Sequence, residues 1–127
     1  LAQSDARIKT VTIDELPAGW LGKCHAMQAG ANAAQGEWLL FTDADVSMKK
    51  DTLQRAISFA TAHSADHVAV APACVLSGWL LNVFVATFVV FFKLFVNPNQ
   101  IANPKSKAHV GIGAFNLVRR DVYLAVG

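Results

Sequence analysis

Two carboxylates, Asp43 and Asp45, lie one residue apart, close behind an apolar segment of the chain. That segment, Trp38-Leu39-Leu40-Phe41, is typical of a buried strand. Side chains alternate along an extended chain, so both carboxylates would project to the same side. Their mutual repulsion would be relieved by a divalent cation or by a ligand rich in hydrogen-bond donors. The pair is therefore a candidate ligand site.

The Asp-x-Asp triplet has two interpretations, which the residues alone support about equally. In the functional one, one carboxylate binds a divalent metal that bridges a diphosphate, and the other binds the metal or a ribose hydroxyl. In the structural one, Asp43 or Asp45 accepts hydrogen bonds from backbone amides in a turn. The position of the pair at a strand end favours a site, because ligands of open α/β sheets bind at the carboxyl ends of strands.

The elements that must position this pair alternate along the chain. Strands are expected at 8–13, 37–42, 67–71 and 111–118, and helices at 23–35, 51–62 and 119–126. Asp51 is the expected cap of the second helix. Strands that alternate with helices predict an α/β fold with a mainly parallel sheet flanked by helices.

Lys23 follows Gly22 at the start of the first predicted helix. The positive end of a helix together with a lysine would suit an anionic ligand. The glycine spacing and the trailing Ser or Thr of a Walker phosphate loop are missing. The alternative is a solvated lysine in the first helical turn.

The overall composition indicates one small and unusually apolar domain. The chain has 127 residues, of which 54% are hydrophobic and 16% charged, with a net charge of +2. This balance gives no support for a nucleic-acid partner. Cys24 and Cys74 have no metal-ligand spacing and are predicted to be reduced, buried thiols.

A long apolar segment occupies the middle of the chain. No charged residue occurs from Val68 to Phe92, and the stretch is long enough for a membrane-spanning helix. A helix that is apolar on all faces is either deeply buried or in lipid, and a chain this small has little core to cover it. We therefore expect residues 75–96 to contact a membrane, by lying in its interface or by spanning it, with Trp79 and Lys93 at the interface. A buried helix of a larger protein is the alternative.

In combination, these motifs resemble family 2 glycosyltransferases over about Val11 to Gly127. The branch they resemble most is the membrane-associated one that includes hopanoid-associated and ceramide-type glucosyltransferases. The matching positions are Gly19-Trp20-Leu21-Gly22-Lys23, Ala26, Gly30, Ala34, Gly36 to Asp45, and Gly111, Gly113, Ala114, Phe115, Leu117, Arg119, Arg120, Tyr123, Ala125 and Gly127.

The resemblance implies a glycosyltransferase A-type (nucleotide-diphospho-sugar transferase) fold and an inverting transfer of sugar. The donor would be a nucleotide-diphosphate-sugar and the acceptor a lipid or a membrane-borne molecule. Asp45 would bind Mg or Mn, Asp43 the metal or the nucleotide ribose, and Lys23 would lie near the nucleotide. Gly113 would leave room for donor sugar and acceptor. The protein would be membrane-associated, with its catalytic domain on the cytoplasmic side.

The resemblance also implies a partial domain. The first, nucleotide-binding strand of the family would precede Leu1, and its catalytic base would follow Gly127. We therefore expect residues 1–127 to be a single partial catalytic domain, inactive alone and with no catalytic base of its own. Two other functions remain open, namely a nucleotidyltransferase, which also uses an acidic pair with a metal, and a non-catalytic module anchored by Leu76 to Phe92.

Overall fold

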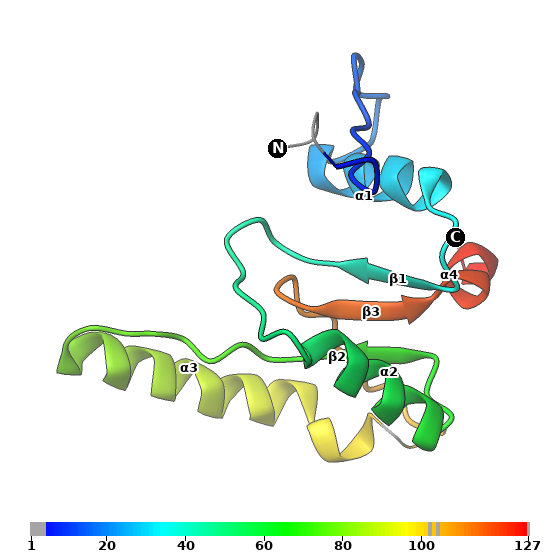
Figure 1. Ribbon diagram of the computed structural model, residues 1–127. Coiled ribbons are helices and arrows are strands. Elements are labelled where there is room, and N and C mark those ends of the chain that lie inside the picture. Colours follow the sequence, from blue (N-terminus) through cyan, green and yellow to red (C-terminus); the bar gives the residue numbers. More distant parts are fainter. Residues whose placement is uncertain (1–4, 102, 104, 127) are drawn as a thin grey trace.

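The structure, a computed structural model, describes residues 5–101, 103 and 105–126. Gly127, the last position of the C-terminal motif, lies outside the described residues. The elements in chain order are α1 (Gly22–Ala33), β1 (Trp38–Phe41), α2 (Thr52–Ala62), β2 (His67–Ala69), α3 (Trp79–Val96), the 3-10 helix η1 (Pro98–Gln100), β3 (Asn116–Arg119) and α4 (Arg120–Val126). Figure 1 shows α1 on one side of a small sheet, α2 on the other, and α3 extending well beyond the sheet.

The sheet has three strands in the order β1-β3-β2, and both strand pairs are antiparallel. The prediction of a mainly parallel sheet is therefore wrong for the described strands. β1 and β2 do run in the same direction, since both oppose β3, as expected for two strands joined by a helix. β3 inserts between them from a distant part of the chain, and no local pattern reveals that long-range pairing.

The core of the sheet lies beneath the middle of β3. Leu117 is fully buried, and its partners in register are Leu40 of β1 and Val68 of β2. Phe115, which directly precedes β3, and Ala56 of α2 complete the buried cluster. The core therefore holds the three strands and α2 together at one point.

Several predicted elements differ from the structure. The alternating segment 8–13 forms no strand, and its apolar side chains Ile8, Val11 and Ile13 are exposed. Alternation alone is insufficient, because a strand also needs a partner that hydrogen-bonds to it. The strand expected at 111–118 begins only at Asn116. Asp51 precedes α2 without a side-chain capping bond, and its Oδ2 lies 3.8 Å from Arg55 Nη1 instead.

The two thiols and the long apolar helix all lie outside the core. Cys24, in the first turn of α1, and Cys74, in the irregular segment before α3, are both free and exposed, so the prediction of buried thiols is wrong. α3 has no buried residue at all, although most of its side chains are large and apolar. The described part of the chain does not cover this helix.

Candidate functional site

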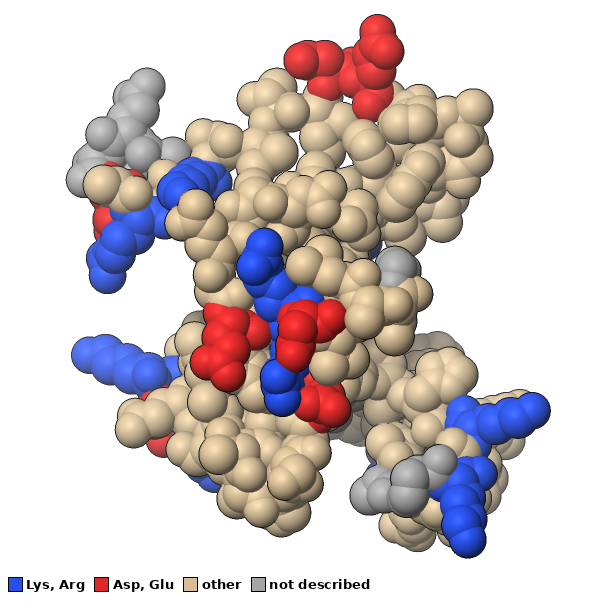
Figure 2. Space-filling model, turned by 90° about the vertical axis from the view of Figure 1, so that its right-hand side faces the viewer, with Lys and Arg blue, Asp and Glu red and all other residues tan. Residues whose placement is uncertain are grey.

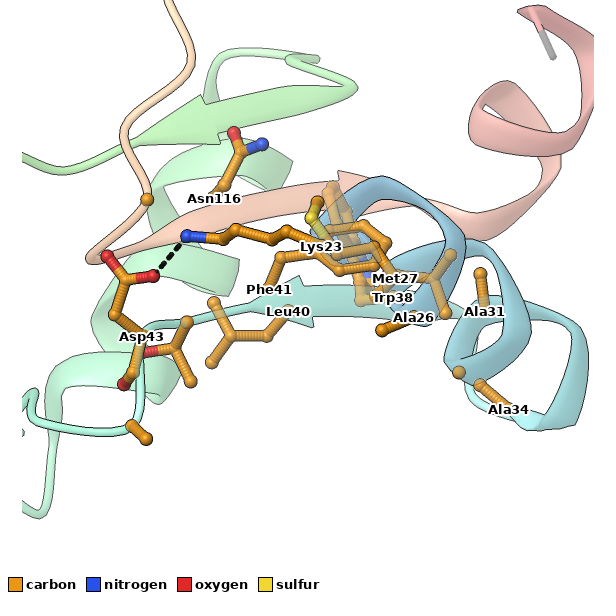
Figure 3. A pocket seen from close by; sticks show the side chains of 15 residues that line it. Lys23, Ala26, Met27, Ala31, Ala34, Trp38, Leu40, Phe41, Asp43 and Asn116 are labelled. Atoms are coloured by element: carbon orange, nitrogen blue, oxygen red, sulfur yellow. Dashed lines mark hydrogen bonds and ion pairs between the residues drawn. The ribbon is translucent and has the colours of Figure 1, made fainter. Parts of the chain in front are cut away.

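A pocket of about 630 Å³ lies between α1 and β1. α1 lines it with small residues and Met27, and β1 lines it with Trp38 to Phe41. Figure 3 shows Lys23, Asp43 and Asn116 at one end of the pocket and Ala34 toward the other. The volume falls in the range of small-molecule sites, which are mostly apolar with a few placed polar groups.

Lys23 and Asp43 form an ion pair at the polar end of this pocket. Lys23, the second residue of α1, extends along β1 until its Nζ lies 2.5 Å from Asp43 Oδ1 (Figure 3). The hydrogen bond to Asp43, and then its negative charge, raise the pKa of Lys23 above the ordinary value of 10.5. The lysine is therefore a full cation at neutral pH, held at the carboxyl end of the strand.

Gly113 packs directly against the Asp43 carboxylate. The Asp43 backbone N–H donates to the Gly113 carbonyl at 3.0 Å, and the Thr42 hydroxyl donates to the Ala114 carbonyl at 2.8 Å. A Cβ added to Gly113 would lie 2.7 Å from Asp43 Oδ2, closer than real Cβ contacts. The glycine is therefore needed for the carboxylate to sit where it does.

Asp45 belongs to the same cluster by charge rather than by contact. It is exposed, and its negative charge contributes to the raised pKa of Lys23. Within the described residues, neither Asp43 nor Asp45 accepts a hydrogen bond from a backbone amide through its side chain. The structural interpretation of the triplet, a turn held by its own carboxylates, therefore has no support.

Asn116, which the sequence analysis missed, is a further polar residue of the pocket. It opens β3, and its Oδ1 accepts a hydrogen bond from His67 Nε2 of β2. A Cβ added to Gly111 would lie 3.7 Å from Asn116 Nδ2, so the amide nitrogen lies beside the glycine-rich segment. The only sequence signal was a polar residue at the start of an apolar strand.

A family comparison decides the class of protein to which this site belongs. The model of the Glycosyl transferase family 2 matches residues 2–127. This chain belongs to that family. No curated protein and no solved structure matched the chain.

Membership makes the protein a glycosyltransferase of the nucleotide-sugar type. The family implies a glycosyltransferase A-type fold, a nucleotide-sugar donor and a separate acceptor. The resemblance read from the motifs is confirmed at this level. The three-stranded sheet, α1 and the pocket between α1 and β1 are the parts of that fold nearest to the Asp-x-Asp triplet.

The described residues of this glycosyltransferase contain no group of three or more His, Cys, Asp or Glu side chains placed to hold a metal ion. The triplet offers two carboxylates, and one of them is engaged by Lys23. Magnesium is commonly held by one or two carboxylates together with substrate phosphates and waters. The donor set of the site therefore fits a metal that arrives with a diphosphate, and not a metal held by protein alone.

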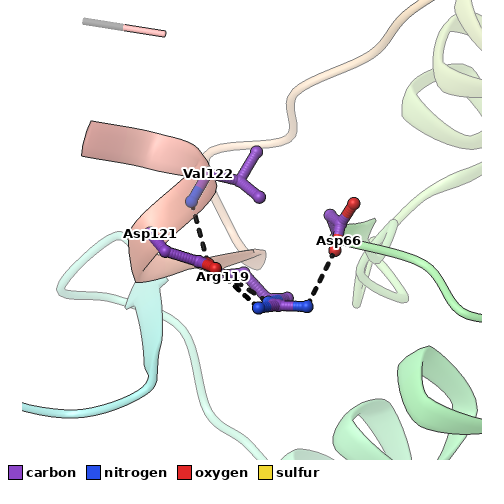
Figure 4. Close-up of polar contacts among 4 residues, drawn as sticks. All are labelled: Asp66, Arg119, Asp121 and Val122. Carbon is purple, nitrogen blue, oxygen red and sulfur yellow. Dashed lines mark hydrogen bonds and ion pairs between the residues drawn. The ribbon is translucent and has the colours of Figure 1, made fainter. Parts of the chain in front are cut away.

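A second charged cluster, at the opposite end of β3, has a structural role. Figure 4 shows Arg119 between Asp121 and Asp66, with distances of 2.6 Å from Nη2 to Asp121 Oδ2 and 3.5 Å from Nη1 to Asp66 Oδ1. The hydrogen bond from Arg119 lowers the pKa of Asp121 below its ordinary value. Figure 2, which faces this side of the molecule, shows basic and acidic side chains intermingled. Arg119, shared by the two carboxylates, joins β3, α4 and the loop before β2.

Proposed function

We propose that this glycosyltransferase transfers a sugar, with inversion, from a nucleotide-diphosphate-sugar to a lipid or membrane-borne acceptor, with the help of Mg or Mn. The observation that carries the proposal is the cluster of Lys23, Asp43, Asp45 and Gly113 at the end of β1. It combines two carboxylates, a cation and a close backbone approach beside a pocket of ligand size.

Asp45, with Asp43, would hold the divalent ion through carboxylate oxygens, and the donor diphosphate would complete the coordination. The ion, when bound, supplies positive charge that stabilises the departing nucleoside diphosphate. Asp45 is the better ligand of the two, because it is exposed and has no ion-pair partner among the described residues. Asp43 would bind the same ion or the nucleotide ribose.

Lys23 would exchange partners when the donor binds. Its ammonium now donates to Asp43, and a diphosphate oxygen would compete for the same donor. The amino-terminal end of α1, where Lys23 lies, also favours negative charge. Transfer of Lys23 to the diphosphate would free the Asp43 carboxylate for the ion or the ribose at the moment of binding.

Gly113 would fix the direction of the Asp43 carboxylate, because the space of its missing side chain is taken by that group. Asn116, held by His67, would offer its amide to the donor at the same end of the pocket. Both residues then act on how the donor lies and not on proton transfer. We assign no catalytic base within residues 1–127.

The membrane-borne acceptor is supported by α3 and its short continuation. The stretch Trp79–Gln100 is long and apolar enough to cross a membrane: an 18-residue window within it has a mean hydropathy of 2.2, and none of that window is buried. An acceptor carried in lipid would bring the sugar-transfer site to a membrane surface. In this proposal the catalytic domain, of which residues 1–127 form a part, lies on the cytoplasmic side.

Sugar transfer by the full-length protein with Asp45→Ala tests the proposal. We expect kcat/KM to fall about a hundredfold or more, because stabilisation of the leaving group is lost. Asp51→Ala removes another exposed carboxylate, one that does not line the pocket, and serves as the control. Undiminished turnover in Asp45→Ala would remove the metal-ligand role.

A non-catalytic module would behave differently in a binding experiment. Calorimetric titration of the full-length protein with uridine diphosphate should show binding that depends on Mn and weakens in Asp45→Ala. Binding that is independent of Mn and unchanged in Asp45→Ala would contradict a diphosphate–metal site. The family match already favours glycosyl transfer over nucleotidyl transfer.

A further inference from the structure

The segment that contains α3 leaves the sheet and returns to it at one point. β2 ends at Ala69 and β3 begins at Asn116, and these two residues are partners in register. The Val70 backbone N–H donates to the Phe115 carbonyl at 3.1 Å, immediately beyond that pair. Residues 70–115 therefore begin and end on the same side of any membrane that α3 enters.

α3 between Trp79 and Lys93 is suited to immersion in lipid. Its internal polar side chains bond back to its own backbone, since Asn82 Nδ2 donates to Gly78 O at 2.7 Å and Thr87 Oγ1 donates to Val83 O at 2.9 Å. Large apolar side chains from Trp79 to Phe95 are exposed along the whole length of α3. A helix satisfies its own backbone groups, as a lipid environment requires.

A single crossing by α3 is incompatible with the return path. Its 18 residues would extend about 27 Å, close to the thickness of the hydrocarbon core. The segment 70–78, which leads from β2 to the far, amino-terminal end of α3, would then have to make the other crossing (Figure 1). It contains Pro72 and forms neither helix nor strand. Irregular backbone exposed to lipid does not occur in the hydrocarbon region.

We propose that α3 lies within one leaflet, entering and leaving the membrane on the side of the sheet, and does not span it. This inference rests on the membrane-borne acceptor proposed above and specifies how deeply α3 enters the membrane that carries it. It follows that the sheet and the pocket between α1 and β1 remain close to one membrane surface. An acceptor would need to move only within that leaflet to reach the pocket.

The occupant of this surface is lipid and not a second protein. A protein partner covers one face of a helix, whereas large apolar side chains from Trp79 to Phe95 are exposed around most of α3. The partly covered ones, Val85, Phe92 and Val96, lie on a single stripe. Trp79 at the first position and Lys93 in the last turn have side chains that favour the interface. Lys93 is the only basic residue within residues 75–96, so the attachment to the membrane is mainly hydrophobic and would persist at high salt.

Labelling from one side of sealed vesicles tests the topology. In the full-length protein with Cys24→Ser and Cys74→Ser, single cysteines are placed before α3 (Ser77→Cys), after it (Asn99→Cys and Lys107→Cys), and on α2 (Gln54→Cys) as the reference. All four positions lie outside α3, and all four are exposed. We expect a membrane-impermeant maleimide to reach all four from the same side. Protection of Ser77→Cys until the vesicles are opened, with Asn99→Cys, Lys107→Cys and Gln54→Cys labelled, would overturn the proposal.

Depth measurements give an independent reading. Nitroxides placed at Leu80, Phe88 and Phe95 sample both ends and the middle of α3. A helix within one leaflet predicts similar depths for the three labels, whereas a spanning helix places Phe88 deepest and the ends shallow. Labels that are all accessible to water-soluble quenchers, or all shielded by protein, would exclude the lipid contact. None of these readings needs turnover, so they fail or hold independently of the Asp45→Ala assay.

Discussion

The charged clusters at the two ends of β3 each contain one cation and two carboxylates, but these charges are paired differently. At its carboxyl end, Arg119 engages both Asp121 and Asp66, so each carboxylate there has a cation. At its amino end, beyond Asn116, one lysine engages Asp43 while Asp45 has no ion-pair partner among the described residues. In the first cluster the single cation contacts both carboxylates and so joins several elements. In the second, one carboxylate beside the pocket has no ion pair among the described residues and is available to a divalent cation.

Both ends depend on the same packing at the middle of the strand. Leu117 is fully buried between Leu40 and Val68, so Leu117→Ala should lower the free energy of unfolding by about 2–5 kcal/mol. Urea denaturation of the full-length protein measures this loss. The exposed Leu124 on α4 is the matched control, and Leu124→Ala should change stability by about 0.5 kcal/mol or less. Equal losses in the two variants would mean that β3 is not the centre of the core.

Removal of one charge at each end separates catalytic from structural carboxylates. Asp43→Asn keeps the shape of the side chain and should reduce kcat/KM for sugar transfer about a hundredfold, since the charge that serves the ion or the ribose is lost. Asp121→Asn makes the same chemical change at the other end and should leave the rate nearly unchanged. A similar loss of rate in both variants would indicate that loss of the charge acts through the fold and not through the site.

The local part of this comparison was predictable from sequence, and the long-range part was not. Asp43 and Asp45 were found because an apolar strand ends there, and Lys23 because a glycine precedes a helix. Asn116 and His67 were missed because their meeting depends on β3 entering between β1 and β2. Strand pairing over such a distance is set by packing, which a local pattern does not encode.

The same distinction explains the error at the amino-terminal end and the success at the apolar segment. Residues 8–13 alternate like a strand but form none, because no described strand pairs with them. The apolar helix α3 needs no partner for its hydrogen bonds, so composition and length alone predicted it. Whether it spans a membrane depends on the return path to β3, which only the sheet register reveals.

Two glycines near the amino end of β3 offer a smaller perturbation. A Cβ on Gly113 would lie 2.7 Å from Asp43 Oδ2, whereas one on Gly111 would lie 3.7 Å from Asn116 Nδ2, an ordinary contact. Gly113→Ala should displace the carboxylate and reduce kcat/KM about tenfold, because small misplacements of reacting groups are costly. Gly111→Ala should have little effect on the same assay. If the alanines behave alike, the Asp43 position is not what limits the rate.

The smallest expected effect is a difference in how the two ends respond to pH. The pKa of Lys23 is raised by Asp43, so its contribution to stability is present below about pH 10.5 and is lost as the pH rises through the higher folded-state value. The pKa of Asp121 is lowered from 3.8 by Arg119, so its contribution is present above that pH and is lost as the pH falls through the lower folded-state value. Both pairs are exposed, and the effects are correspondingly small.

Denaturation midpoints measured over pH should show this difference. The midpoint of Lys23→Met should differ from that of the unmodified protein at neutral pH and converge with it at alkaline pH. The midpoint of Asp121→Asn should converge with that of the unmodified protein at acid pH. Convergence of both variants at the same extreme would show that the two clusters do not stabilise the fold through separate ion pairs.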